Sequence, residues 1–281
     1  MRIALVQMCS GRDRAANLER SESLIRQAAS RGVHWVLTPE NTPFLGRDRE
    51  KLAIADHIDG PTVDVYRKLA KDLNIWLTLG STAELSKDPK RTHNTQVLID
   101  PQGDVASSYR KIHLFDVDVD VDNSFRESDS VAPGSQPVVA QLPGPGESTW
   151  SVGLSICYDL RFPELYRSYQ HQGCQVLTVP SAFTRRTGSA HWHALLRARA
   201  IENQAYVLAP NQWGHHFGNR YSFGQSAVYD PWGQLIASAS DGESITTADL
   251  NMNKVLEIRR SMPVLDHRRL TTIEQNRPVE R

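Results

Sequence analysis

Three apolar, β-prone runs each lead to a chemically reactive side chain, and this repeated pattern constrains the fold more than any other feature. The runs are residues 33–37, 104–109 and 151–156, which lead to Glu40, Lys111 and Cys157 respectively. In open α/β architectures, ligands bind at the carboxyl ends of the strands. We therefore expect three strand ends to converge on one pocket that holds a carboxylate, an amine and a thiol.

The rest of the chain alternates predicted strands with predicted helices and contains two tight turns. Mixed hairpins and crossovers favour an α/β fold in which two sheets are sandwiched between helix layers. In the helix expected at 188–204, we predict that Ala194, Leu195, Ala198 and Ile201 face inward. The other predicted helices are 13–31, 62–73 and 163–172, and the other predicted strands include 3–8, 75–80, 94–100, 175–179, 205–210, 224–230, 234–238 and 245–249.

Size and composition agree with one large catalytic domain. The 281 residues include 32 Lys plus Arg and 32 Asp plus Glu, so the net charge is near zero. Nothing in this balance favours a nucleic acid or an anionic membrane as a partner. No run approaches the ~20 apolar residues of a membrane span, and the N-terminus resembles no export signal. With three cysteines, one of them needed as a thiol, we expect a reducing, cytoplasmic location.

The three reactive residues together could cleave an amide through a thioester. A free cysteine has a pKa near ~8.5, so it needs a base or a cation nearby to react at neutral pH. Glu40 can take the thiol proton, return it to the leaving nitrogen and later activate water. Lys111 can favour the thiolate and then the oxyanion.

The motifs around these residues resemble those of the nitrilase, or carbon-nitrogen hydrolase, superfamily. They are LTPEN at Glu40, YRKIHLFD at Lys111 and SICYDLRFPELY at Cys157. The resemblance implies a Glu-Lys-Cys triad and a backbone N–H of Tyr158 that binds the oxyanion. It also implies that Glu127 supports Lys111. The implied fold is a four-layer αββα sandwich with two mixed β-sheets.

Within the superfamily, the chain most resembles the Nit branch, which includes deaminated glutathione amidases and ω-amidases. The resemblance rests on THNTQVLID, VYDPWG and the long segment 180–209, although Gln225 stands where the branch commonly has histidine. It implies hydrolysis of the ω-amide of deaminated glutathione to 2-oxoglutarate and cysteinylglycine. The alternatives are an ω-amidase acting on 2-oxoglutaramate and a catalytically silent binding relative.

The resemblance covers residues 1–270 as a single carbon-nitrogen hydrolase domain. It also implies a homodimer or a larger homo-oligomer, with the C-terminal segment 253–281 contacting a partner subunit. For the small amide substrate, we predict binding by Asp159, Phe183, Thr184 and Arg185. The segment that includes Arg185 and the adjacent Arg186 offers guanidinium groups, which recognise carboxylates.

Two apparent metal motifs are better explained otherwise, and no metal or cofactor is expected. Asp116, Asp118, Asp120 and Glu127 have much of the spacing of an EF-hand loop, but the position that needs glycine holds Val121. We interpret the acidic run as a loop that covers the pocket, with Glu127 turned inward. The histidine pairs His191/His193 and His215/His216 lack the spacing of a closed zinc site.

Overall fold

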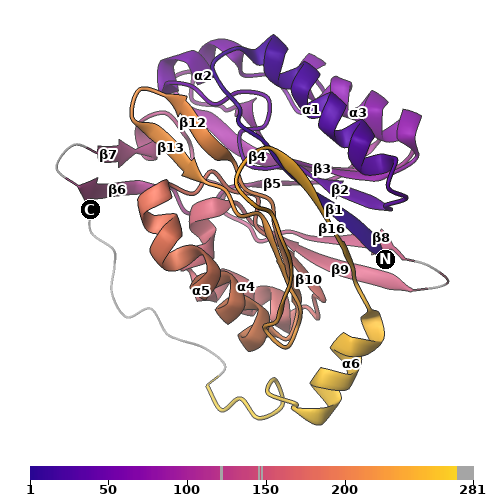
Figure 1. Ribbon diagram of the computed structural model, residues 1–281. Helices are drawn as coiled ribbons and strands as arrows, with labels where there is room; N and C mark the ends of the chain where they lie inside the picture. The colour runs from indigo at the N-terminus through magenta and orange to yellow at the C-terminus, as the bar shows by residue number, and fades with distance from the viewer. Residues whose placement is uncertain (121–122, 145, 147, 271–281) are drawn as a thin grey trace.

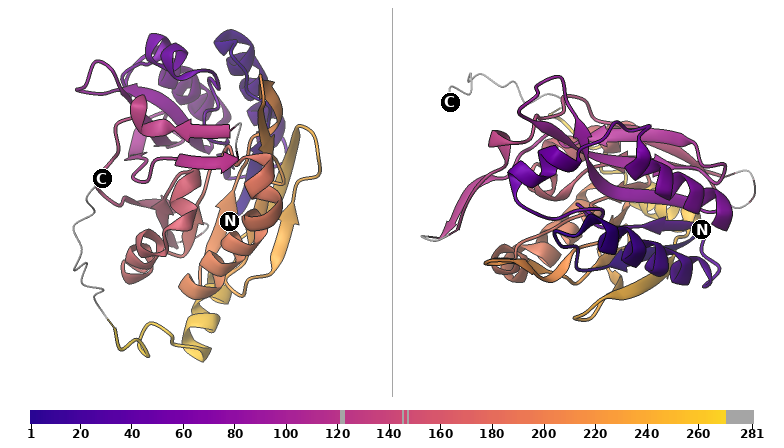
Figure 2. Two further views of the ribbon diagram at one scale, coloured as in Figure 1. Left: turned by 90° about the vertical axis from the view of Figure 1, so that its left-hand side faces the viewer. Right: turned by 90° about the horizontal axis from the view of Figure 1, so that it is seen from above.

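Two six-stranded β-sheets stack face to face, and helices cover the outer face of each (Figures 1 and 2). The computed structural model describes residues 1–120, 123–144, 146 and 148–270. This arrangement confirms the predicted four-layer αββα sandwich. The helices are α1 (Arg14–Ala29), α2 (Asp48–Ile54), α3 (Pro61–Leu73), α4 (Pro163–His171), α5 (Arg185–Asn203) and α6 (Met252–Ser261).

The first sheet has the strand order β16-β1-β2-β3-β4-β5. Its three central strands, β1 to β3, are parallel, and the flanking strands are antiparallel to their neighbours. Strands covered on both faces have near-continuous apolar sequences, as β1 does. The strands are β1 (Arg2–Gln7), β2 (Trp35–Leu37), β3 (Trp76–Leu85), β4 (Thr92–Ile99), β5 (Val105–Arg110) and β16 (Ser244–Asp249).

The second sheet repeats this pattern with the order β8-β9-β10-β11-β14-β15. Strands β9 to β11 are parallel, with one antiparallel strand on one side and two on the other. The two halves of the sandwich therefore have the same topology. The strands are β8 (Val139–Pro143), β9 (Thr149–Leu154), β10 (Val176–Thr178), β11 (Tyr206–Ala209), β14 (Ala227–Tyr229) and β15 (Leu235–Ser238).

The largest apolar cluster lies between the sheets and under α5, and it includes Trp35, Trp150 and Trp192. A polar contact also crosses this interface, because the amide of Gln96 donates to the hydroxyl of Thr178 at 2.9 Å. Close packing of this kind holds the strand ends in fixed positions relative to each other. Side chains that follow those strand ends are therefore held rigidly.

Two hairpins project from one end of the sandwich (Figure 1). The first corresponds to the acidic run that we predicted to be a loop, and it forms an antiparallel pair instead. The hairpins touch, since the guanidinium carbon of Arg220 lies 4.7 Å from the ring centroid of Phe125. Their strands are β6 (Asp116–Asp120), β7 (Asn123–Arg126), β12 (Trp213–Phe217) and β13 (Arg220–Phe223).

The inward face of α5 differs from the prediction. Trp192, Leu196 and Ala200 are buried, whereas Ile201 is 50% exposed and Ala194 is also exposed. Bulky Trp192 and Leu196, four residues apart, define the buried stripe. Of the predicted inward set, Leu195 is partly buried and packs against the core, as predicted. The prediction was wrong for Ala194, Ala198 and Ile201, which are exposed, because it followed a stripe displaced around the helix.

Strand β3 lies unusually close to the segment that follows β2. A side chain at Gly80 would put its Cβ 2.1 Å from the carbonyl oxygen of Thr38 and 2.3 Å from that of Pro39. The register between β3 and β4 shifts here, between Leu79 and Thr82. The missing side chain at Gly80 therefore allows the two backbones to meet immediately before Glu40.

The C-terminal part of the chain continues past β16 into α6, which is the last helix among the described residues. Of the predicted partner-contacting segment 253–281, residues 271–281 lie outside the described part of the chain. Across the described residues, each helix is too short or too polar to cross a membrane.

Candidate active site

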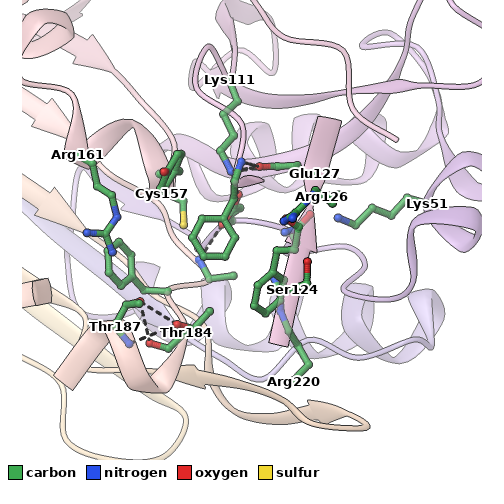
Figure 3. Close-up of a pocket in the computed structure, with 17 residues that line it drawn as sticks. Lys51, Lys111, Ser124, Arg126, Glu127, Cys157, Arg161, Thr184, Thr187 and Arg220 are labelled. Carbon is green, nitrogen blue, oxygen red and sulfur yellow. Dashed lines mark hydrogen bonds and ion pairs between the residues drawn. The ribbon is translucent and has the colours of Figure 1, made fainter. Parts of the chain in front are cut away.

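The side chains of Glu40, Lys111, Glu127 and Cys157 line one cavity of about 140 Å³ (Figure 3). They follow strands from both sheets: Glu40 follows β2, Lys111 follows β5 and Cys157 follows β9. The predicted convergence of three strand ends is confirmed. The other residues around the cavity are Asn41, Lys51, Phe115, Ser124, Phe125, Arg126, Tyr158, Arg161, Ala182, Phe183, Thr184, Thr187 and Arg220.

Both carboxylate oxygens of Glu40 accept hydrogen bonds inside the protein. Oε1 accepts from Lys111 Nζ at 3.0 Å and from the Asn94 amide at 2.9 Å. Oε2 accepts from the backbone N–H of Ala182 at 2.8 Å. Since Ala182 follows β10 of the second sheet, this last bond joins the two sheets at the site. The carboxylate is thereby fixed in orientation.

The ammonium group of Lys111 is buried between two carboxylates. In addition to Glu40, it contacts both oxygens of Glu127, at 3.0 and 2.9 Å. Burial alone would lower the pKa of Lys111, but the charges of Glu127 and Glu40 outweigh it and raise this pKa well above its usual value. Lys111 is therefore a permanent cation at the centre of the site.

Glu127 points inward from the end of the first hairpin. Burial would raise its pKa, yet the positive charges of Lys111 and Lys51 dominate and lower it, so the side chain is a carboxylate. Its Oε2 also accepts from the backbone N–H of Phe115 at 2.7 Å. Glu127 thus ties the hairpin to Lys111.

The backbone at Cys157 is in the left-handed region, with φ of 49°. Non-glycine residues in this region are uncommon and cluster at functional sites. The Cys157 N–H donates to the carbonyl of Pro180 at 3.0 Å, which anchors the turn to the segment after β10. The nucleophile candidate is therefore held on a strained turn immediately beyond a strand.

The thiol of Cys157 is protonated in the resting site. Burial raises its pKa most, the negative charge of Glu40 raises it further, and Lys111 lowers it by less. Lys111 thus acts in the predicted direction, but it does not produce a resting thiolate. Proton transfer to a base must accompany attack of the sulfur on a substrate.

Tyr158 is the second residue of a 3-10 turn that spans Cys157–Arg161. The first N–H groups of a helical turn have no partner within the turn, so they can bind an anion. The ring of Tyr158 lies against Phe115, with 5.1 Å between centroids, and both rings line the cavity.

Asp159 does not reach the cavity, contrary to the prediction that it binds substrate. It is fully buried, and it accepts hydrogen bonds from the Tyr109 hydroxyl at 2.7 Å and the Ile156 N–H at 2.9 Å. It also accepts from the His113 backbone N–H at 3.0 Å, and the His113 ring lies at 2.7 Å. Its carboxylate is fully used in joining the Cys157 turn to the segment around Lys111.

The α5 entry segment agrees with the prediction only in part. Phe183 and Thr184 line the cavity, and the Thr184 hydroxyl caps α5 by accepting from the N–H of Thr187. Arg185 is exposed on the first turn of α5 and does not line the cavity. The correction follows from the helix itself, which starts three residues earlier than predicted and turns Arg185 toward solvent.

Several residues around the cavity were not predicted. Asn94 does not line the cavity, but it is buried and donates to Glu40, because a buried polar side chain needs a partner. Arg161 stacks over Tyr158 and Phe183, with its guanidinium carbon 5.8 and 5.3 Å from the ring centroids. Lys51 and Arg220 come from distant segments and have no local sequence signal.

Among the residues that the structure describes, no group of three or more histidine, cysteine, aspartate or glutamate side chains could hold a metal ion. Within the acidic hairpin, Asp118 pairs with Arg126 at 2.9 Å. Asp116 accepts from the backbone N–H of Ser128 at 3.0 Å.

Comparison with known proteins agrees with this geometry. Residues 2–260 match the carbon-nitrogen hydrolase family. The chain is 38% identical to a deaminated glutathione amidase of Yersinia enterocolitica, covering 96% of this chain and 93% of the relative. It is 40% identical to the corresponding protein of Synechocystis, covering 94% and 97%.

Solved structures give the same result. The Nit3 protein of Saccharomyces cerevisiae, a member of the nitrilase superfamily, superposes with a TM-score of 0.85 at 29% identity over 96% of this chain and 97% of that one. A mutant amidase of Nesterenkonia, with acrylamide added to its active-site cysteine, gives 0.77 at 27% identity over 94% and 99%. The resemblance predicted from sequence is confirmed, and the chain belongs to the carbon-nitrogen hydrolase family.

Proposed function

We propose that this protein is an amidase that hydrolyses the ω-amide bond of deaminated glutathione to 2-oxoglutarate and cysteinylglycine. The observation that carries the proposal is the Glu40 carboxylate, which bridges a buried cation, Lys111, and the thiol of Cys157. The names of the relatives support the choice of substrate, because they are deaminated glutathione amidases that match this chain over nearly its full length.

In the first half-reaction, Glu40 takes the thiol proton while the sulfur of Cys157 bonds to the amide carbon. The carbonyl electron pair moves to oxygen, where the Tyr158 N–H and the Lys111 ammonium can stabilise the negative charge. Glu40 then gives its proton to the amide nitrogen. The carbon–nitrogen bond breaks, cysteinylglycine leaves with a free amine, and a thioester remains on the sulfur.

In the second half-reaction, Glu40 takes a proton from water as the water oxygen attacks the thioester carbon. The same oxyanion donors act again. When the intermediate collapses, the carbon–sulfur bond breaks, the proton on Glu40 returns to the sulfur, and 2-oxoglutarate leaves as the acid. Glu127 and Asn94 support both steps by holding Lys111 and Glu40 in place.

A cavity with cations on its wall suits a substrate with a 2-oxo-acid carboxylate. Arg161 lines the cavity close to Cys157 and is held against two aromatic rings. Both deaminated glutathione and 2-oxoglutaramate carry this carboxylate, so an ω-amidase remains the second candidate. A silent binding relative fits less well, because all three reactive groups are present in contact.

Parallel kinetics on deaminated glutathione, 2-oxoglutaramate and a simple nitrile test the proposal. The first two both release 2-oxoglutarate, so one coupled assay measures them. We expect kcat/KM to be at least about tenfold higher for deaminated glutathione, a difference of roughly 1.4 kcal/mol. The reverse preference would make the protein an ω-amidase, and activity on the nitrile alone would reject both amidase assignments.

We also propose a homo-oligomer in which residues 253–281 contact a partner. The described part of this segment supports the proposal, because Leu256 and Met262 are 47% and 46% exposed. Burying such side chains at an interface is favourable. Light scattering of the purified chain tests this, and a monomer at micromolar concentration would contradict it.

We propose a cytoplasmic location for the protein as well. The nucleophile must stay a thiol, and a reducing compartment preserves it. Cell fractionation tests this, and recovery of the protein outside the cytoplasm would contradict it.

A further inference from the structure

A second hollow of about 210 Å³ adjoins the catalytic cavity and shares Asn41, Lys51 and Arg220 with it. Arg47 contributes a third cation to this second hollow, which we call the cationic hollow. The described residues that line it include no carboxylate. Its remaining lining residues are Leu45, Gly46 and Phe217.

The charge of this hollow is concentrated in a protein that is neutral as a whole. Glu50, whose Oε2 accepts from the Arg47 N–H at 2.9 Å, lies near the charge of Arg47 but forms its ion pair with Arg12, and it does not line the hollow. Lys51 is close enough to the catalytic cavity for its charge to lower the pKa of Glu127. The cationic hollow therefore presents positive charge next to the reacting groups.

Arg220 is the residue whose bonding most directly indicates a ligand. Its guanidinium stacks on Phe125, and its Nε is buried with no hydrogen-bond partner among the described residues. Leaving a buried donor unpaired costs about 1–3 kcal/mol, so such donors are normally satisfied. A carboxylate in the hollow could accept from Arg220, since this pairing is strong and directional.

We propose that the cationic hollow of Arg47, Lys51 and Arg220 binds the terminal carboxylate of the peptide that leaves during acylation. This inference rests on the proposed function, because it assigns the second carboxylate of that substrate. Cysteinylglycine carries one carboxylate, and the 2-oxoglutaryl group carries the other. The scissile amide lies between them, as Cys157 lies between Arg161 and the cations of the hollow.

Figure 3 shows this arrangement, with Arg161 on one side of Cys157 and with Lys51 and Arg220 on the other. Arg161 belongs to the same turn as Cys157 and is held by two aromatic rings. It suits the acyl group, which stays on the sulfur as a thioester. Arg220 begins a strand of a peripheral hairpin, where a leaving group can depart.

The size of the catalytic cavity favours the same assignment. At about 140 Å³ it is small beside the roughly 300–1,000 Å³ of pockets that enclose drug-sized ligands. It suits the 2-oxoglutaryl group, so the peptide must extend beyond it. Two hollows adjoin it: one of about 500 Å³, whose lining includes Arg161 and Arg186 but also the carboxylate of Asp118, and the cationic hollow, whose described lining has no carboxylate.

A matched pair of substrates tests the proposal: deaminated glutathione and the same compound with its terminal carboxyl converted to a carboxamide. We expect the wild-type enzyme to prefer the acid, mainly through KM. In Arg220→Gln this preference should shrink by roughly tenfold or more, the value of a charge-assisted hydrogen bond. Lys51→Met should shrink it as well, and Arg220→Lys should retain part of it.

Arg197→Gln is the matched control, because Arg197 is exposed on α5 and stacks on Tyr229, away from the hollow. It should keep the wild-type preference, and thermal melts should show that every variant is folded. An unchanged preference in both Arg220→Gln and Lys51→Met overturns the proposal. An equal loss by Arg220→Gln on 2-oxoglutaramate also overturns it, since that substrate has only the acyl carboxylate.

The same assay separates the failure of this inference from the failure of the proposed function. If the wild-type enzyme cleaves neither member of the pair, the proposed function is wrong. If it cleaves both, and the variants have the same preference as the wild type, the amidase assignment stands and only the leaving-group site is rejected.

Discussion

The active site consists of two regions that are held in different ways. The catalytic floor comprises Glu40, Lys111, Glu127 and Cys157, and the rim comprises Lys51, Arg126, Arg161 and Arg220. Floor side chains are almost fully buried and share hydrogen bonds among themselves. Rim side chains lie on hairpins, turns and a short helix, and each carries positive charge at the edge of the cavity.

This difference suggests a division of labour. The floor is fixed by strand ends from two sheets, and groups that act in a transition state need such fixed geometry. The rim lies on peripheral segments, which can change without disturbing the core. Floor substitutions should therefore reduce kcat by the same factor for every substrate, whereas rim substitutions should change which substrate is preferred.

Removing the nucleophile should have the largest effect. Cys157→Ala should lower kcat by roughly a thousandfold or more on all amides, because no thioester can form. Trapping of the acyl-enzyme by mass spectrometry should succeed with the wild type and fail with the variant. Substantial residual activity would mean that the floor is not where the bond is cleaved.

The buried cation should come next. Lys111→Met should lower kcat by about 10²–10³, the usual loss when an oxyanion donor is removed. The factor should be the same for deaminated glutathione and for its carboxamide. The control is Lys68→Met, because Lys68 is exposed on α3. A pure KM effect of Lys111→Met would move Lys111 from the floor to the rim.

The third prediction concerns the pH dependence of stability at the hairpin that carries Arg220. Burial lowers the pKa of His216, in β12, to about 4, and its ring bonds the Ser10 carbonyl and the Ser222 hydroxyl. The pKa of His216 in the folded protein lies below its unfolded value near 6.5. The stability that comes from burying the neutral ring is therefore fully present above pH 6.5 and is lost as the pH falls toward 4. We expect the tendency of His216 to take up a proton on unfolding to lower the free energy of unfolding by about 2 kcal/mol between pH 7 and pH 5.

Urea unfolding at the two pH values measures this contribution. In His216→Gln, the difference between pH 7 and pH 5 should be smaller than in the wild type by that amount. An identical pH difference in the two proteins would show that His216 does not couple the hairpin to acid.

The smallest expected effect is on the rate at which the Cys157 thiol is alkylated. Glu40 raises the pKa of the Cys157 thiol, so Glu40→Gln should lower it and increase the thiolate fraction at pH 8. Alkylation by iodoacetamide should then be severalfold faster in the variant, although turnover is lost. Slower alkylation would show that Glu40 activates the thiol at rest rather than during attack.

The floor could be predicted from the sequence because its signals are local. Each reactive residue follows an apolar strand and lies in a distinctive motif, and the carboxyl ends of strands meet at one edge of a sheet. The fold class could be predicted for the same reason. Glu127 depended on the family resemblance, since its own surroundings are merely polar.

The rim could not be predicted, because distant segments build it. Lys51, Arg126 and Arg220 are ordinary surface residues in the sequence, and helix α2 and the two hairpins bring them together around the cavity. Asp159 was misassigned because its motif is adjacent to Cys157, yet the turn buries it among backbone donors. Sequence proximity to a nucleophile does not show on which side of the turn a carboxylate lies.

The close approach at Gly80 shows that the position of the base, Glu40, depends on the absence of a Cβ atom at residue 80. Even the methyl group of alanine would collide with the carbonyls of Thr38 and Pro39. Relieving that collision would shift the backbone that leads directly into Glu40. A substitution at Gly80 should therefore reduce activity, although this residue contributes no side chain to the chemistry.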